Sequence, residues 1–489
     1  MKSTRIASIL LLIAVVLAAL VSCGGGSENE AVNEALTTAG DTAAETEVTT
    51  SIYDDLPTGD FGGYNFRILN NWSNFAYTSF GEEGLTGEVL DDAIYERNAI
   101  VAELLNITFE IQQLRWDDND TALKKSVLAN DDVYDIYFNE GSFEAVHAQN
   151  GYVVDMKGIN SLNPDAPWWN QVATESIRIG SPLYYLYGDL HLMYYECYCG
   201  MLMNTTACES VGLETPYDIV SSGGWTIDRA SEYVKSGYLD LNGDSTVTAD
   251  DQFGIGMHHH NAISFITGSD LEIVERDSNN LPVWNGLDDR FITRYTTVAE
   301  KIFGDKNLVC NGDTKGIGSL DRTVNTMFGL GRLIFFVEPL GALGLYRDCE
   351  FEIGIIPVPK YDEAQDEYYS YIYRGAPAMG IPVTNTDLER TGVVAENLCA
   401  YSLKTVRQTY FDVTLDFKRI QDKESQEMLD IIFANGKASL ANVYGWANFA
   451  GDLSTRIGKG NTDIASFAAS RESKLVAAIQ ETIDCFAGQ

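Results

Sequence analysis

Oxygen-bearing side chains are concentrated between Asp240 and Asp251, in the stretch DLNGDSTVTADD. An EF-hand-like loop binds calcium through oxygen atoms at alternate positions, because calcium prefers many hard oxygen ligands around a tightly turned backbone. The residues in the ligand positions are Asp240, Asn242, Asp244, Thr246 through its backbone carbonyl, Thr248 and Asp251. The spacing predicts that this loop binds Ca²⁺.

Two departures from the usual loop lower the expected affinity. Ser245 stands where Gly is usual, and Asp251 is one carbon shorter than the usual Glu, although Asp250 could replace it as a ligand. Only one such loop is present, whereas a calcium sensor uses paired loops. We therefore expect a weak, structural calcium site. The alternative is an acidic turn without metal.

Three consecutive histidines, His258 to His260, form a second candidate for metal binding. Consecutive side chains seldom point together, so a loop is the better interpretation. The chain has no GxSxG or HExxH motif, and the Gly-rich run at Gly329 lacks the GxGxxG frame of a nucleotide site. The sequence therefore favours a protein that is not an enzyme.

The elements that must position these residues alternate between strand and helix patterns. Residues 64–69, 107–114 and 133–138 are rich in strand formers, and residues 85–105 and 121–128 have apolar residues at helical spacing. This order predicts an α/β lobe with a largely parallel sheet.

Further elements follow in the second half of the chain. A helix is predicted over residues 225–237, with Asp228 as N-cap and Gly237 just past its end. Strands are predicted within residues 331–341 and 351–361, and a helix over residues 387–402. At 489 residues the chain is long enough for two domains.

The balance of charge is strongly acidic. The chain has 71 Asp and Glu against 33 Lys and Arg, which gives a net charge of −38. Such a surface repels phosphate backbones, so we expect no nucleic-acid partner. A neutral or cationic ligand is the simpler expectation, although a local basic pocket or a single buried Arg can override the overall field.

The N-terminus predicts export. Residues 1–22 combine Lys2 and Arg5 with an apolar run and then small residues, the pattern of a signal peptide. The run ending at Cys23 resembles the lipobox of bacterial lipoproteins, which implies lipidation of Cys23. The alternative is a membrane-spanning anchor, for which the run is short. Residues 23–59 are predicted to be the lipidated Cys and a flexible acidic tether.

Seven further cysteines have no repeating spacing. Cys197 and Cys199 lie two apart in a strand-rich stretch, where a mutual disulfide would be strained. We expect mostly buried free thiols.

The order of several stretches resembles family 1 of the extracellular solute-binding proteins, the carbohydrate-associated receptors of bacterial ABC transporters. The resemblance covers residues 60–489. The stretches that carry it, besides the lipobox, are YYLYGDLHLMYYECYCGMLMN, GGWTIDRASEYV, GRLIFFVEPLG with FEIGIIPVPKYDEAQDEYYSY, and AMGIPVTNTDLERTGVVAENLCAYS.

The resemblance implies a periplasmic binding protein type II-like fold, in which hinge strands join two α/β lobes and a ligand lies in the cleft between them. One lobe would comprise residues 60–190 and 336–380. The other would comprise residues 200–332 and 385–489 and contain the loop 240–251.

Candidate ligand-binding residues lie after the predicted strands and at the implied crossings between lobes. Aromatic faces stack on sugar rings, and planar polar groups bind hydroxyl pairs. These candidates are Trp72, Trp116, Asn139, Glu140, Asp189, Tyr194, Tyr195, Glu338, Arg374, Tyr444 and Trp446. Each aromatic residue has core packing as its alternative, and Arg374 and Glu338 could instead form an ion pair between lobes.

The resemblance implies a lipid-anchored, monomeric solute-binding protein on the extracellular face of the membrane. It would capture a sugar or oligosaccharide and deliver it to the subunits of an ABC permease. Two alternatives stay open: a secreted glycan-active enzyme with a calcium loop, and a protein that binds peptides, polyamines or a surface.

Overall fold

The computed structural model describes Tyr53 and residues 55–487, apart from residues 74–76, 82–83, 319–321 and 418–422. Residues 52–489 form one compact unit. The predicted signal peptide, Cys23 and most of the tether lie outside the described residues. Within the part of the chain that is described, no helix is long and apolar enough to cross a membrane.

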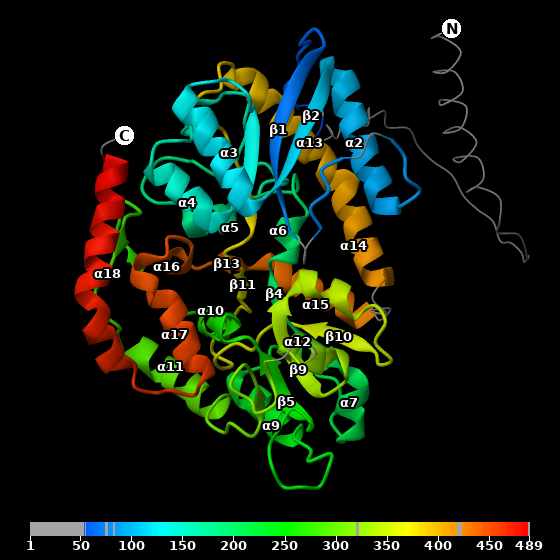
Figure 1. The fold of residues 1–489 in the computed structure, drawn as a ribbon, viewed down its shortest axis with the longest axis vertical. Coiled ribbons are helices and arrows are strands. Elements are labelled where there is room, and N and C mark those ends of the chain that lie inside the picture. The colour runs from blue at the N-terminus through cyan, green and yellow to red at the C-terminus, as the bar shows by residue number, and fades with distance from the viewer. Residues whose placement is uncertain are drawn as a thin grey trace, which may run out of the picture. The chain divides into compact units, whose positions relative to one another are not determined.

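A four-stranded sheet has the order β12, β3, β1, β2. Figure 1 shows β1 and β2 side by side in this sheet. β1 is parallel to β2 and β3, whereas β12 is antiparallel to β3. The strands are β1 (Tyr64–Trp72), β2 (Ile107–Arg115), β3 (Ile136–Glu140) and β12 (Pro377–Gly380). The predicted parallel sheet in the first half of the chain is confirmed.

Helices connect and cover these strands. The crossover helix α2 packs against α13 and α14, which come from far along the chain, and buries Leu90, Ile94 and Val101. The helices are α2 (Val89–Leu105), α3 (Trp116–Ala129), α4 (Gly141–Gln149), α13 (Leu388–Lys404) and α14 (Val406–Phe417).

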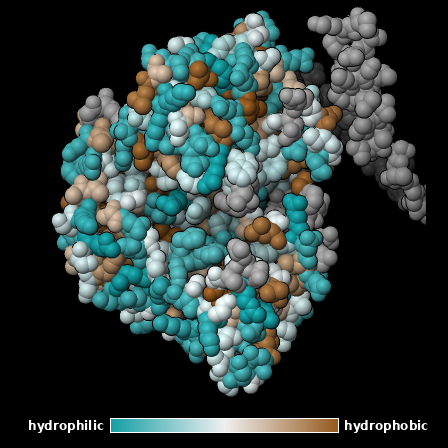
Figure 2. All heavy atoms as spheres, viewed as in Figure 1, coloured by the Kyte–Doolittle hydropathy of each residue, from teal (hydrophilic) through white to brown (hydrophobic). Residues whose placement is uncertain are grey.

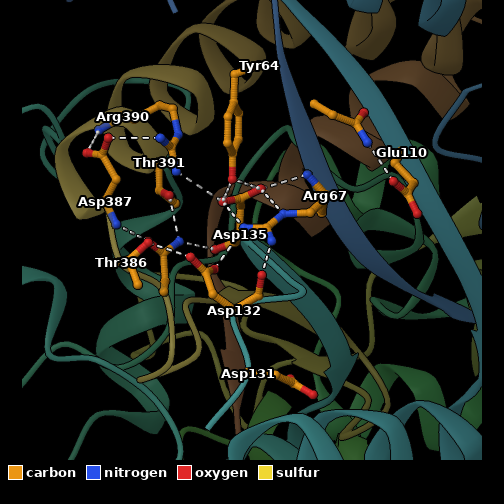
Figure 3. A network of polar contacts seen from close by, with 12 residues as sticks. Tyr64, Arg67, Glu110, Asp131, Asp132, Asp135, Thr386, Asp387, Arg390 and Thr391 are labelled. Atoms are coloured by element: carbon orange, nitrogen blue, oxygen red, sulfur yellow. Dashed lines mark hydrogen bonds and ion pairs between the residues drawn. The ribbon is translucent and has the colours of Figure 1, made fainter.

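A polar network fastens α13 to this sheet (Figure 3). The fully buried Asp135 accepts hydrogen bonds from the hydroxyl of Tyr64, and from the backbone N–H and guanidinium of Arg67. Arg390 on α13 lies 3.7 Å from Asp135, and its guanidinium carbon lies 3.6 Å from the centre of the Tyr64 ring. The network therefore ties β1, the residues before β3 and α13 together.

A five-stranded sheet has the order β10, β4, β9, β5, β8. β4 is antiparallel to β10 and β9, whereas β5 is parallel to β9 and β8. The strands are β4 (Cys199–Asn204), β5 (Phe253–Met257), β8 (Val309–Cys310), β9 (Leu333–Pro339) and β10 (Ile353–Ile356). β9 begins with the apolar run LIFFV and is buried along that run, as expected for an inner strand covered on both faces.

The main helices of this second sheet include α9 and the long C-terminal helix α18 (Figure 1). α9 begins after Thr226, whose side chain accepts from the N–H of Arg229, so the predicted N-cap Asp228 is wrong by two residues. The helices are α9 (Ile227–Ser236), α10 (Ile263–Gly268), α11 (Asp289–Lys301), α15 (Lys423–Ala434), α17 (Phe449–Gly458) and α18 (Ile464–Ala487).

Short elements complete the described chain. They are α5 (Gln171–Ile177), α6 (Met193–Glu196), α7 (Thr205–Ser210), α8 (Tyr217–Ser221), α12 (Val324–Gly329), α16 (Leu440–Val443), β6 (Glu275–Arg276), β7 (Pro282–Val283), β11 (Ser370–Ile372), β13 (Gly436–Ala438), η1 (Met156–Gly158), η2 (His259–Ala262), η3 (Leu340–Tyr346) and η4 (Trp446–Asn448).

Two chain segments run side by side where the chain passes between the sheets. Tyr198, just before β4, bridges to Ile372 at the end of β11. The N–H of Tyr373 donates to the carbonyl of Cys197 at 2.7 Å. The chain then enters β12 of the first sheet, so these segments connect the two sheets.

The strand pairing corrects the predicted lobe boundaries. Residues 336–339 and 353–356, assigned to the first lobe, lie in β9 and β10 of the second sheet, where both strands flank β4. α13 and α14, assigned to the second lobe, pack on α2 of the first sheet instead. The helix α15 returns to the second sheet, against β10.

The cysteines agree with the sequence prediction. Seven are free, and five of them are buried: Cys197, Cys199, Cys208, Cys310 and Cys399. The face seen in Figure 2 is largely hydrophilic, with hydrophobic residues scattered among polar ones, in keeping with the acidic composition.

Candidate functional site

Ends of strands from both sheets approach one another near the crossing segments. Glu140 ends β3, Glu338 lies near the end of β9, and His258 directly follows β5. Arg374 follows β11. Its backbone carbonyl oxygen lies close to Gly141, the residue after Glu140: a Cβ atom at position 141 would be only 3.2 Å from that oxygen. Carboxyl ends of strands in open α/β sheets are where ligands bind.

A cavity of about 330 Å³ lies at this junction. It is near the lower limit of small-molecule pockets, enough for one or two sugar rings. Its lining combines aromatic rings with hydroxyl, amide and charged groups. The lining residues are His260, Ile263, Tyr371, Tyr373, Arg374, Asn442, Asn448, Ala450, Gly451, Asp452, Ser454 and Thr455.

Two acids near the cavity, Glu140 and Glu338, have raised pKa values. Burial raises the pKa of Glu338 to about 8, although Asn261 donates a hydrogen bond to its carboxylate. Burial also raises the pKa of Glu140, and the positive charge of Arg374 partly opposes this shift. Glu338 is therefore mostly protonated at neutral pH and can donate a hydrogen bond.

One of the three histidines, His260, lines the cavity, which the loop interpretation of the sequence missed. The rings of His258 and His260 stack, with centroids 5.4 Å apart and planes 11° apart. His258 also hydrogen bonds to Asn325 at 2.6 Å, and Ser454 donates to the carbonyls of His259 and His260. Their position directly after the strand-like run FGIGM was the sequence feature that could have identified them.

His260 is neutral in this environment. Partial burial lowers its pKa to about 4, and the neighbouring His258 and Arg374 add to that effect. Its ring centroid lies 6.3 Å from that of Tyr373 on the crossing segment. A neutral imidazole and a phenol thus present ring faces and polar edges to the same cavity.

Of the predicted ligand-binding residues, Arg374 lines the cavity. Glu140 lies within electrostatic range of Arg374, and Glu338 hydrogen bonds to Asn261, which directly follows the lining residue His260. Asn139 is fully buried, and its amide donates to the carbonyl of Trp116, whose ring packs on Phe143 at 5.5 Å. Trp72, at the end of β1 beside Arg115, is 43% exposed and remains a candidate for stacking.

Three other predicted residues lie in the core instead. Asp189, Tyr194 and Tyr195 are almost fully buried. Asp189 accepts from the hydroxyl of Tyr195 and lies 3.3 Å from Arg407, while burial raises its pKa to about 6. These three residues lie in the segment that leads from the first sheet to the second, as predicted. They are buried there among other side chains and do not line the cavity.

Tyr444 and Trp446 also pack away from the cavity. Their rings stack with centroids 5.3 Å apart, and the Trp446 indole donates to Thr482 on α18. They therefore fasten α18 to the segment before α17. Among the described residues, Arg374 and Glu338 form no ion pair within 4.0 Å, so the predicted alternative of an ion pair between lobes is wrong.

The EF-hand-like loop forms a compact turn between α9 and β5. Gly243 and Ser245 have positive φ of 73° and 58°, so Ser245 adopts the conformation for which Gly is usual. The carboxylate of Asp240 accepts the N–H groups of both residues. The Asp240 carboxylate therefore lies inside the turn.

Asp251 closes the same loop from the core side. It is fully buried; one oxygen accepts from the N–H of Thr248, and the other, Oδ1, has no hydrogen-bond partner. Asp250 instead lies 2.9 Å from Arg322, so it is occupied elsewhere. No group of three or more His, Cys, Asp or Glu in the described ranges is arranged to hold a metal, so any ion here would also need Asn242, Thr248 and the Thr246 carbonyl.

Comparison with known proteins gives a match in structure only. No protein-family model matches the chain, and no curated protein matches it by sequence. A cyclic alpha-maltosyl-1,6-maltose binding protein from Arthrobacter globiformis is 13% identical and has a TM-score of 0.55, covering 88% of this chain and 100% of its own. The fold is that of the ABC solute-binding proteins.

Two further structures share this fold. An ABC substrate-binding protein from Listeria monocytogenes, in complex with cycloalternan, is 11% identical with a TM-score of 0.52, covering 87% of this chain and 99% of its own. The maltose/maltodextrin-binding domain from Bdellovibrio bacteriovorus, bound to maltotriose, is 12% identical with a TM-score of 0.50, covering 85% and 99%. The predicted type II-like solute-binding fold is confirmed.

Proposed function

We propose that this protein is the solute receptor of an ABC importer and captures a sugar or oligosaccharide. The observation that carries the proposal is the cavity beside the crossing segment that leads from β11 to β12, which is lined by Tyr371, Tyr373 and Arg374 of that segment and by residues of η2, α10 and α17. Its rings, hydroxyls and amides are the groups that bind sugars. The structures that share the fold are described as binding proteins for such solutes.

The receptor would act by closing around its ligand. Among the described residues, two neighbouring crossing segments connect the sheets, so rotation about them would change the width of the cavity. A ligand that contacts both sides favours the closed form, which the permease then recognises. The protein itself would perform no chemistry.

The proposal includes attachment and location. Lipidation of Cys23 and the acidic tether would hold the receptor at the extracellular face of the membrane, close to the permease subunits. We also propose that it acts as a monomer. These features rest on the sequence pattern of the N-terminus and on the solute-binding fold.

Ligand binding has a direct test. A panel of mono- and oligosaccharides is expected to include at least one that raises the melting temperature in scanning fluorimetry, because a ligand that binds only the folded state stabilises it. Peptides and polyamines in the same assay serve as the comparison. A response confined to them contradicts the sugar assignment, and turnover of a glycan contradicts a pure receptor.

We also propose that the loop 240–251 binds Ca²⁺ as a structural ion. The support is the donor set and the buried Asp251, whose unpartnered oxygen a cation would satisfy. The loop lies between α9 and β5, and none of its residues lines the cavity. A bound ion would therefore hold the loop and not the solute.

Removal of calcium is expected to lower stability more than affinity. Chelator should lower the melting temperature by several degrees, and Asp251→Asn should abolish that response, while the sugar dissociation constant changes less than about twofold. Asp228→Asn, outside the loop, is the matched control and should keep the response. Loss of sugar binding at an unchanged melting temperature would overturn the assignment.

A further inference from the structure

Arg374 differs from most other arginines of this chain. It is exposed and has no carboxylate within 4.0 Å among the described residues. Acids outnumber bases by more than two to one, so an exposed guanidinium readily finds a partner. Arginines that do lie within 4.0 Å of a carboxylate are Arg67, Arg115, Arg178, Arg229, Arg290, Arg322, Arg332, Arg390, Arg407 and Arg471.

The acids nearest to the cavity do not neutralise Arg374. Asp452 is paired with Arg471 at 2.7 Å and accepts from Asn448 at 2.9 Å. Glu338 bonds to Asn261, and its burial favours the neutral form. Glu140 lies within electrostatic range of Arg374 but forms no ion pair with it. A cation that lacks a protein counterion therefore lines the cavity.

The groups around Arg374 suit a sugar that carries an acid. Tyr373 and His260 present ring faces, and Asn442 and Asn448 present amides. Arg binds a carboxylate through two parallel hydrogen bonds, which Lys cannot reproduce. The neutral His260 is a further hydrogen-bond partner beside the guanidinium.

We propose that the solute is an acidic sugar, such as a uronic acid or an oligosaccharide containing one, and that Arg374 binds its carboxylate. This inference rests on the proposed receptor function. It differs from the expectation that the acidic surface selects neutral or cationic ligands, because one unpaired Arg inside the cavity outweighs distant, screened charges.

The test compares acidic sugars with their neutral counterparts by titration calorimetry. Galacturonate and digalacturonate, glucuronate, and the matching galactose and glucose ligands are titrated into the full receptor. At least one acidic sugar is expected to bind at least tenfold more tightly than its neutral counterpart. Arg374→Gln should weaken that binding about 10- to 100-fold, because a hydrogen bond to a charged group is lost.

Two control variants separate the possible outcomes. Arg374→Lys should restore only part of the affinity, and Arg229→Gln on the surface of α9 should have no effect. Binding of neutral sugars with no dependence on Arg374 would overturn the acidic-sugar inference and leave the receptor function standing. If no sugar of either class binds to a correctly folded receptor, the proposed function itself fails. Arg374 is exposed, so its variants are expected to fold, and circular dichroism checks this.

Discussion

Replacing Asp135 with Ala is expected to destabilise the protein by about 3–5 kcal/mol, the cost of removing one partner of a buried ion pair. The carboxylate is fully buried and binds Tyr64 and Arg67, with Arg390 close by. Without it, both guanidinium groups lose their shared counterion. Urea unfolding at neutral pH measures the change in free energy of unfolding.

The matched control is an ion pair at the surface. Asp228 pairs with Lys301, and the two side chains are 68% and 43% exposed. Asp228→Ala should therefore cost about 1 kcal/mol or less, since exposed pairs contribute little. Equal losses in the two variants would show that the network around Asp135 does not fasten α13 to the sheet.

Local patterns predicted much of the fold. The alternation of strand and helix patterns in residues 64–138 identified three parallel strands and two helices. The spacing of apolar residues distinguishes strands from helices, and strands that are joined through helices usually lie parallel in one sheet. Helix α13 was predicted over residues 387–402 and spans Leu388–Lys404, with Asp387 as its N-cap. These elements could be predicted because they are determined mainly by residues that are close together in the sequence.

Features that depend on distant packing were predicted less well. β9 and α13 were assigned to the wrong lobes. The residues of an apolar strand or helix do not indicate which sheet the strand will join or the helix will cover. The same limit applies to Asp189 and Tyr194, polar residues next to a crossing that prove to be buried. Their burial follows from packing against residues far along the chain, such as Arg407.

The candidate site likewise contains residues that local sequence patterns identify and residues whose position depends on distant packing. Arg374, chosen at a predicted crossing because strand ends are where such folds place ligands, lines the cavity, whereas Glu140 and Glu338, chosen on the same ground, do not. His258 and His260 also follow a strand, but they were considered only as metal ligands. Their stacked arrangement depends on the turn into η2 and on Ser454 of α17, which no spacing in the sequence reveals.

Glu338 is expected to make stability depend on pH. Its pKa is about 8 in the folded protein and near 4.5 when unfolded. Between these values the folded state keeps a proton that the unfolded state has released. Stability therefore falls as pH rises from about 4.5 to 8, by about 2 kcal/mol once the partial exposure of the side chain is allowed for.

Glu338→Gln removes this titration and keeps an oxygen to accept the Asn261 hydrogen bond. The variant should match the parent near pH 4.5 and exceed its stability by about 2 kcal/mol at pH 8.5. Glu232→Gln, on the exposed face of α9, is the control and should follow the parent at every pH. Parallel curves for the parent and Glu338→Gln would mean that Glu338 titrates in the folded protein as it does in the unfolded chain, which would rule out a carboxyl that burial keeps protonated at neutral pH.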